Sequence, residues 1–487
     1  MPYLLLKNWQ GYNDTDDPEN IQPNQLAKNS QNVITTDGGQ VKTRRGKTSL
    51  AGTVGASAVI GLYRAYMWGM AASQKLVWNP LTPVSNPRLV AVGDAEYKAY
   101  TGTAWTSLAT VTANQIPSFC VYQSGGVDYL VMTNAEDAPL RWRGDLAVAA
   151  ATFTSPVMKY QFCEEFQGFL FLLRGKTNGR QWQCSADGDM TNWPAYHLDD
   201  QAATDVITGS KKFAGALTIH TERMVYALRG WGIDTFNIDE MVVGSGAVAH
   251  NTIIETPFGL FYLGSEGPYL YRGGTQAQPV GGDIQGILAD LSFDYRHRSC
   301  AALKEGRYIF LSMPIGSGQK ENNKTLRLDL QRGVWDPPIT DGYASLASAD
   351  RGGDPNRLYG GETAGGVVLI IDEGTSDDGT AIDAIAEFIA MSQEVDVFHS
   401  HFRKMSVYGK ANAAGTVITP RYRDEIDGTA TDLDTMTFGT SNIKQSSQLP
   451  GAAQGMFCVP SLRCNILDRE MLIRRIAVDY TPYGESR

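Results

Sequence analysis

The sequence predicts an all-β protein, in which a β-propeller of about six to eight blades precedes a C-terminal β-sandwich-like domain. Composition is the first reason: 51 glycines, 22 tyrosines and 21 prolines in 487 residues favour short strands and turns over long helices. A recurring phrase of a strand and a glycine turn is the second reason, and a change of pattern after Gly374 is the third. A chain of this length also exceeds the size at which one hydrophobic core usually stops growing.

The first predicted element is an N-terminal arm with a hairpin, assigned to residues 1–50. In the stretch NVITTDGGQVKTRRG, residues 33–36 and 40–43 are expected to pair as two short strands. The DGG turn between them tolerates the positive φ that a tight turn requires. Two arginines follow the second strand directly, Arg44 and Arg45.

The propeller is predicted for residues 51–377 from a repeat. Its strands end in glycine turns, as in PLRWRG, VYALRG and YLYRGG. The marker glycines are separated by 42, 44, 42, 44, 59 and 41 residues, and they are Gly102, Gly144, Gly188, Gly230, Gly274, Gly333 and Gly374. A repeat of about 40 to 45 residues built from short strands is typical of propeller blades, each of which is a four-stranded sheet.

The one long interval is expected to contain an insertion. Within it, DIQGILADL fits a short helix, and GSGQKENNK is a polar loop that precedes a new strand. Such an insertion lengthens the interval without breaking the period.

The strands of this region are apolar with only partial alternation, as in DYLVMTN, GFLFLLRG and GRYIFLSMP. This pattern predicts sheets that neighbouring blades cover on both faces. Five tryptophans fall near strand ends: Trp105, Trp142, Trp182, Trp193 and Trp335. We interpret them as packing between blades, and the alternative is a row on which a ligand stacks.

Residues 378–487 are predicted to form the C-terminal β domain. Three stretches read as strands: FRKMSVYGK, GTVITPRYRDE and LIRRIAVDYTPY. The stretch TAIDAIAEFIAMSQ, at the junction with the propeller, fits a strand by its alternation. It also fits a helix by the spacing of Ile382, Ile385, Ala386 and Ile389, so periodicity leaves both open.

Composition narrows the class of function. A formal net charge of −10 argues against a broad basic surface that grips duplex DNA. No apolar run approaches the roughly 20 residues of a membrane helix, and MPYLLLKNW lacks the features of a secretion signal, so no membrane anchor is expected. The cysteines form no CxxC pair and are expected to be buried, reduced thiols: Cys120, Cys163, Cys184, Cys300, Cys458 and Cys464.

No catalytic, cofactor-binding or metal-binding residue is predicted. The acidic pairs lie in turn-like contexts and are interpreted as solvated turn acids: Asp199 with Asp200, Asp239 with Glu240, Asp372 with Glu373, and Asp377 with Asp378. The histidines lack zinc-ligand spacing, although the HSH at 399–401 would place two rings on one face of a strand. The DGD at 187–189 lacks the further ligands of a calcium loop. No GxSxG elbow, P-loop or GxGxxG after a strand occurs.

The stretch CSADGDMTNW resembles the Asp-box of sialidase-type propellers, and Ser185, Asp187 and Trp193 match its character. Asp189 stands where the box has glycine, and Trp193 lies one residue late. The box is structural in that family, so the resemblance implies a turn between outer blade strands and not catalysis.

The stretch ENIQPNQLAKNSQNVITTDGGQVKTRRGKTSL is similar to the opening of many bacteriophage tail and head-to-tail proteins. The residues that carry this phrase are Asn32, Asp37, Gly38, Arg44, Arg45 and Gly46. VIGLYRAY followed by KLVWNP, and later GAVAHNTIIETPFGLFYLG, also resemble nozzle or tail-hub proteins of short-tailed phages. The resemblance covers about residues 20 to 375, with a looser match of the C-terminal domain.

The resemblance implies a structural virion protein without catalysis or cofactors. Such subunits assemble as a homo-oligomeric ring, commonly a hexamer, below the portal and adaptor proteins, where they close and guide the DNA ejection channel. Genomic DNA would pass through without sequence readout. The expected location is the virion tail, after assembly in the cytoplasm of the host bacterium.

Two other classes of function stay open. A receptor- or carbohydrate-binding module at a tail tip would bind glycans without turnover. A propeller glycosidase would show a central cluster of carboxylates and arginines.

We hypothesise that the opening hairpin closes the ring or reaches a neighbouring subunit. Arg44 and Arg45 would then make bidentate contacts to carboxylates there. The alternative is that both arginines lie at a solvated hairpin end.

Overall fold

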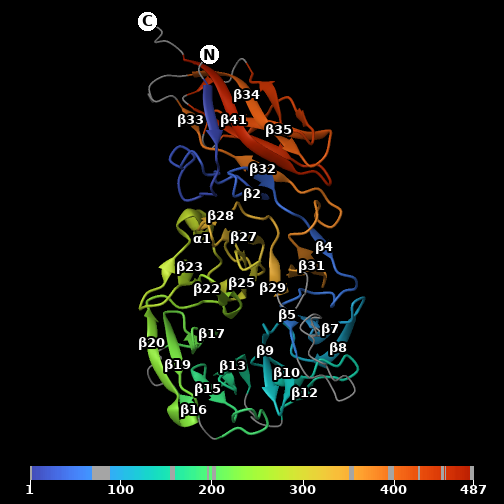
Figure 1. Ribbon diagram of the computed structural model, residues 1–487, viewed down its shortest axis with the longest axis vertical. Coiled ribbons are helices and arrows are strands. Elements are labelled where there is room, and N and C mark those ends of the chain that lie inside the picture. Colours follow the sequence, from blue (N-terminus) through green and yellow to red (C-terminus); the bar gives the residue numbers. More distant parts are fainter. Residues whose placement is uncertain are drawn as a thin grey trace.

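The computed structural model describes residues 3–67, 88–153, 159–194, 197–199, 205–349, 356–392, 400–425, 428–450, 454–455 and 457–482. Figure 1 shows two parts: a ring of small sheets, and a second β domain that contains the C-terminal strands and sits at the edge of the ring. The described residues are almost entirely strands and turns, as the composition predicts.

The ring consists of seven four-stranded antiparallel sheets, which we call blades 1 to 7. Blade 1 contains β5 (Gly61–Ala65), β6 (Arg88–Gly93), β7 (Glu96–Tyr100) and β8 (Trp105–Thr110). Blade 2 contains β9 (Ser118–Ser124), β10 (Val127–Thr133), β11 (Leu140–Trp142) and β12 (Ala151–Thr152). Blade 3 contains β13 (Tyr160–Phe166), β14 (Phe169–Gly175), β15 (Gln181–Cys184) and β16 (His197–Asp199).

Blades 4 to 6 repeat this order from the axis outward. Blade 4 contains β17 (Gly209–Phe213), β18 (Ala216–His220), β19 (Met224–Arg229) and β20 (Asn237–Val243). Blade 5 contains β21 (Ile254–Thr256), β22 (Gly259–Gly264), β23 (Gly267–Tyr271) and β24 (Gln278–Pro279). Blade 6 contains β25 (Cys300–Lys304), β26 (Tyr308–Met313), β27 (Lys324–Asp329) and β28 (Val334–Trp335).

Blade 7 is assembled from both ends of the propeller sequence. Its first three strands are β29 (Tyr343–Ala349), β30 (Arg357–Glu362) and β31 (Val368–Ile371). Its outermost strand is β4 (Lys47–Ser49), which precedes blade 1 and pairs antiparallel with β31. The N-terminal segment therefore closes the ring.

An apolar cluster fills each of the seven boundaries between blades, and the one between blades 5 and 6 continues into the second domain. Between blades 3 and 4, for example, Phe171 and Trp182 pack with Leu228, and between blades 7 and 1, Tyr359 packs with Leu62. The other boundaries are filled in the same way. Burial on both sheet faces explains why these strands read as nearly continuous apolar runs. Of the five tryptophans, the most buried ones confirm the interpretation of packing: Trp142, Trp182 and Trp335.

The marker glycines confirm the blade period. Each follows the third strand of a blade, and each has a positive φ, between 63° at Gly188 and 135° at Gly230. Residues with a side chain rarely adopt this conformation, so the same turn in each blade selects glycine. The long fifth interval holds the expected helix, α1 (Gln285–Ala289), and the polar loop between β26 and β27.

The second domain is a sandwich of two sheets. One sheet has the order β2 (Val33–Thr35), β3 (Val41–Thr43), β41 (Met471–Pro482), β34 (Ser400–Ala411) and β38 (Ile443–Gln448), with β1 (Tyr3–Lys7) paired to β41 and β39 (Gln454–Gly455) to β34. The other contains β32 (Ala384–Glu387), β40 (Phe457–Cys464), β35 (Thr416–Arg423) and β36 (Thr431–Asp432), with β33 (Met391–Ser392) paired to β40 and β37 (Met436–Phe438) to β35. Their facing side chains, such as Val407, Ile476 and Leu462, share one core.

The ambiguous junction stretch is therefore a strand. Its buried positions alternate over Ile382, Ala384 and Ala386, and β40 supplies the pairing partner that periodicity alone could not show. Short 3-10 turns complete the connections: η1 (Ile233–Thr235), η2 (His250–Thr252), η3 (Gly282–Ile284) and η4 (Arg296–Arg298).

The N-terminal residues do not form the separate arm of residues 1–50 that the sequence predicts. The hairpin does form, with Val33 opposite Thr43 and Thr35 opposite Val41, but it adds to the sandwich sheet beside β41. The first fifty residues thus belong to two domains, since β1 to β3 lie in the sandwich and β4 in the propeller. Long-range strand pairing decides this division, and a local turn signal does not report it.

Candidate functional site

The sequence directs attention first to Arg44, which lies just after the hairpin. Its side chain is only 4% exposed, and it contacts Asp377 in a bidentate manner: Nη1 donates to Oδ1 at 2.8 Å and Nη2 to Oδ2 at 2.6 Å. Nη2 also lies 3.1 Å from Asp341, and Nε donates to Asn32. Burial lowers the pKa of Arg44, but the hydrogen bonds and charge of Asp377 outweigh it and leave the pKa raised.

The hypothesis therefore has a different outcome for each of the two arginines. Arg44 makes the bidentate carboxylate contact that was expected, but its partner belongs to the same chain. Asp377 is only 15% exposed, so interpreting it as a solvated turn acid is wrong. Arg45 is exposed, and the assembly contact stays a prediction for this residue alone.

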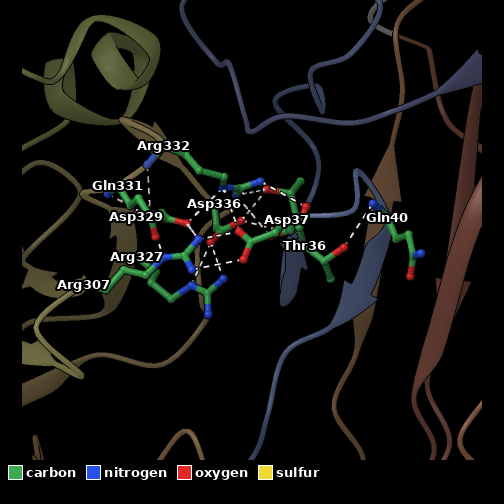
Figure 2. A network of polar contacts seen from close by, with 10 residues as sticks. Thr36, Asp37, Gln40, Arg307, Arg327, Asp329, Gln331, Arg332 and Asp336 are labelled. Carbon is green, nitrogen blue, oxygen red and sulfur yellow. Dashed lines mark hydrogen bonds and ion pairs between the residues drawn. The ribbon is translucent and has the colours of Figure 1, made fainter.

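A second polar network joins the hairpin turn to blade 6 (Figure 2). Arg307 bridges two carboxylates, since it hydrogen bonds to Asp37 in the turn and donates from Nε to Asp329 at 2.9 Å. Arg332 also contacts Asp329 and donates to the backbone carbonyls of Thr35 and Thr36 at 3.1 and 3.2 Å. These contacts cross from the sandwich to the propeller and fix the position of the hairpin on blade 6.

A buried ion pair continues this network. Arg327 Nε donates to Asp336 at 2.7 Å, and both side chains are nearly inaccessible. The second oxygen of Asp336 accepts from the backbone N–H and the hydroxyl of Thr35 at 2.8 and 3.0 Å. The carboxylate of Asp336 thus accepts hydrogen bonds from both domains. These buried hydrogen bonds hold the hairpin against blade 6.

The other candidate is a cavity of about 330 Å³ on the propeller axis. Residues of the inner strands of all seven blades line it, and its charged side chains are Arg64, Glu164, Lys211 and Glu255. Burial raises the pKa of Glu164, although Lys211 lies 3.5 Å away and opposes the shift. The volume is within the range of small-molecule sites, at its lower end.

Ser118 and His250 form a partly buried pair beside this cavity. The Oγ of Ser118 lies 3.1 Å from Nε2 of His250, which is the spacing of a nucleophile and its base. However, Nδ1 of His250 accepts from the backbone N–H of Ser210, so Nε2 carries the proton and donates to Ser118. Burial also lowers the pKa of His250 to about 3. This pair cannot remove a proton from the serine.

Sequence reasoning missed the axial charges and the blade 6 network. Glu164 and Lys211 occupy inner strands of consecutive blades and are 47 residues apart, close to one blade period. Glu164 follows Gly144 by 20 residues and Lys211 follows Gly188 by 23, so aligning the marker glycines brings the two residues near one another without pairing them. No local signal links Arg307 and Arg332 to the hairpin, because their partners there lie 270 and 296 residues away.

The remaining sequence predictions have these outcomes. The Asp-box-like residues lie in the turn between β15 and β16, the outer strands of blade 3, where Trp193 donates to the carbonyl of Met190. All six cysteines are free and buried, as expected. In the HSH stretch, His399 is outside the described residues. Within the described ranges, no group of three or more metal-binding side chains is found.

No protein-family model and no curated protein sequence matches the chain. Among solved structures, the chain is similar to BamB from Moraxella catarrhalis, with 12% identity and a TM-score of 0.38, over 69% of this chain and 97% of BamB. The strand pairing and the closed ring of four-stranded sheets show that the fold is a β-propeller. In the part of the chain that the structure describes, no helix is long and apolar enough to span a membrane.

Proposed function

We propose that this protein is a structural subunit of a phage tail nozzle or head-to-tail connector. In this proposal, several copies form a ring, commonly a hexamer, that contacts portal and adaptor proteins and closes and guides the DNA ejection channel. The proposal includes no catalysis and no cofactor. The assignment to a phage depends on the sequence resemblance. The inference that the subunit is a rigid scaffold depends on the fold.

The observation that supports a scaffold role is the interlock between the two domains. One N-terminal segment pairs with β41 in the sandwich and, a few residues later, with β31 in the propeller. An apolar core then runs from blades 5 and 6 into the sandwich, and it includes Trp9 and Trp335. A subunit built this way presents its surfaces at fixed angles, which ring assembly requires.

The size of the axial cavity determines where DNA would pass. The grooves of B-DNA are about 8.5 and 7.5 Å deep, so a duplex is at least about 16 Å across. A cavity of about 330 Å³ cannot admit it. We therefore place the channel between subunits, in the lumen of the ring. A net charge of −10 suits a lining that does not grip phosphates.

The test is the mass of the purified protein in solution, alone and mixed with neighbouring head-to-tail proteins, followed by negative-stain images. A ring with an axial hole is the expected result. A persistent monomer that ignores those partners would contradict the proposal.

Arg45 provides a matched test of the assembly contact. Arg45→Ala is expected to weaken ring formation, whereas Arg272→Ala, at another exposed arginine, should leave it unchanged. Equal assembly of both variants would remove Arg45 from the interface. Arg44→Ala is unsuitable for this purpose, because it disrupts a buried contact within the chain.

A carbohydrate-directed function is the second candidate, and the axial cavity is the observation that favours it. Two carboxylates and one arginine line the cavity, namely Glu164, Glu255 and Arg64. The raised pKa of Glu164 is a property of carboxyls that act as general acids. Binding or hydrolysis of host polysaccharide by a monomer, lost in Glu164→Gln, would favour this function over the scaffold role.

A further inference from the structure

A second, smaller cavity opens at one mouth of the propeller axis. Its volume is about 240 Å³, and it shares His250 and Asn251 with the axial cavity. Its walls come mainly from segments that lead into inner strands: residues 114–116 before β9, Thr208 before β17, residues 248–251 before β21, and His297 and Arg298 before β25. We call this space the mouth cavity.

The polar groups that line the mouth cavity are basic or neutral, and they alternate with apolar side chains such as Phe162 and Val248. Arg174, His297 and Arg298 contribute to its walls, and no aspartate or glutamate is among the described lining residues. Arg298 is already paired, since its Nη1 contacts Glu321. The neighbouring Arg296 is paired with Glu222 at 3.1 Å.

Arg174, unlike Arg296 and Arg298, is not paired with a carboxylate in the described part of the chain. Among the described residues, it has no ion pair and no side-chain hydrogen bond, and its guanidinium instead lies 6.0 Å from the ring centre of Phe162. Burial lowers the pKa of Arg174, although Glu222 opposes the shift. An arginine stays charged at neutral pH despite such a shift, so a partly desolvated charge lacks a close partner.

The backbone at Arg174 is also strained. Its φ is 59°, in the left-handed region that bulky residues seldom adopt, at the end of β14. Glycine is the residue that usually adopts this conformation, and here it is the next residue, Gly175, that is a glycine. The fold therefore holds an arginine side chain at the mouth in spite of local strain.

We propose that the mouth cavity binds a small oxyanion, a phosphate or carboxylate group, with Arg174 as its main ligand. The planar guanidinium offers two parallel N–H donors that match such a group. The side-chain amides of Asn251 and Gln115, also in the wall, supply further donors. The volume corresponds to about eight water molecules, which is enough for one small oxyanion with part of its hydration shell. The axial cavity holds the carboxyl groups of Glu164 and Glu255 beside its two cations, whereas the described lining of the mouth cavity holds no carboxyl group, so an anion is better accommodated at the mouth.

The experiment is isothermal titration of the full chain with inorganic phosphate and, separately, with acetate, at constant ionic strength set with sodium chloride. Saturable binding is expected, and the comparison of the two anions distinguishes a phosphate site from a carboxylate site. Arg174→Gln should weaken binding about tenfold or more, because it removes a charge-assisted contact. Arg272→Gln, at an exposed arginine away from the mouth cavity, should bind like the unmodified protein.

Two results would overturn the proposal. One is the absence of saturable binding of either anion up to about 10 mM. The other is equal affinity of Arg174→Gln and the unmodified protein. If Arg174→Gln does not fold, Asn251→Asp replaces it, since a carboxylate in the wall should repel the anion while Arg174 stays in place. Unchanged binding by Asn251→Asp would then reject the site.

Discussion

At the scale of single residues, the two adjacent arginines show how burial separates neighbours in sequence. Arg44 is enclosed between the end of the hairpin and the loop after blade 7, and Arg45 points to solvent. The sequence predicts a bidentate contact between Arg44 and a carboxylate, and the structure contains this contact. It could not predict which carboxylate, because Asp377 is 333 residues away.

Arg44→Ala is expected to lower the free energy of unfolding by about 3 kcal/mol, because it leaves Asp377 partly buried without its partner. Arg45→Ala should change it by less than about 0.5 kcal/mol, as is usual for exposed positions. Urea unfolding followed by circular dichroism measures both. Similar values for the two variants would show that the Asp377 contact contributes no net stability.

Acid sensitivity follows from two histidines inside the propeller, of which His220 is buried and His250 is partly buried. Burial lowers the pKa of His220 and of His250 to about 3, so both are neutral in the folded protein. The unfolded chain binds protons below about pH 6.5 and the folded chain does not, so stability is lost as the pH falls from 6.5 towards 3. We expect a loss of about 2 kcal/mol for each histidine between pH 7 and pH 5.

Urea unfolding at pH 7 and pH 5 tests this expectation. The double variant His220→Gln with His250→Gln should show a flatter dependence on pH, whatever its stability at pH 7. The raised pKa values of Glu164 and Glu387 act in the opposite sense, and they are common to both proteins. An equal pH dependence of variant and unmodified protein would contradict the assignment to the histidines.

At the scale of elements, the closing strand β4 has the greatest consequence. It is only three residues long, and Thr48 at its centre is exposed. Without β4, blade 7 would have three strands, and the edge of β31 would be open to solvent. The sandwich depends on the same segment, because the hairpin that joins its larger sheet directly precedes β4.

Thr48→Pro tests the closure, since proline removes the backbone N–H from the pairing with Ile370. We expect a loss of about 3 kcal/mol and faster proteolysis near blade 7. Thr48→Val is the matched control, because it keeps the N–H and favours a strand at an exposed position. Equal stability of the two variants would mean that β4 is dispensable.

At the scale of the whole molecule, the two domains are expected to unfold together. The shared apolar core and the ion pairs of Arg307 and Arg332 cross the boundary between them. Scanning calorimetry should therefore show one transition, with calorimetric and van't Hoff enthalpies in agreement. Two resolved transitions would show that the interlock is weaker than its contacts indicate.

The sequence by itself determined the blade period, the strand pattern and the buried thiols. These depend on local properties: positive φ selects glycine at the same turn of each blade, and burial on both faces selects apolar strands. Such properties repeat along the chain, so they can be read without knowing the partners. The helix in the long interval and the Asp-box-like turn were predictable for the same reason.

Only the tertiary structure decided which segments meet. It placed the hairpin in the sandwich, β4 in blade 7 and Arg44 against Asp377. It also brought Arg174 to the mouth cavity without a close carboxylate partner. The physical reason is that an open sheet edge or a buried charge can be satisfied by any complementary group of the chain. Which group does so depends on how the whole chain is arranged in space, and a local stretch of sequence does not report this.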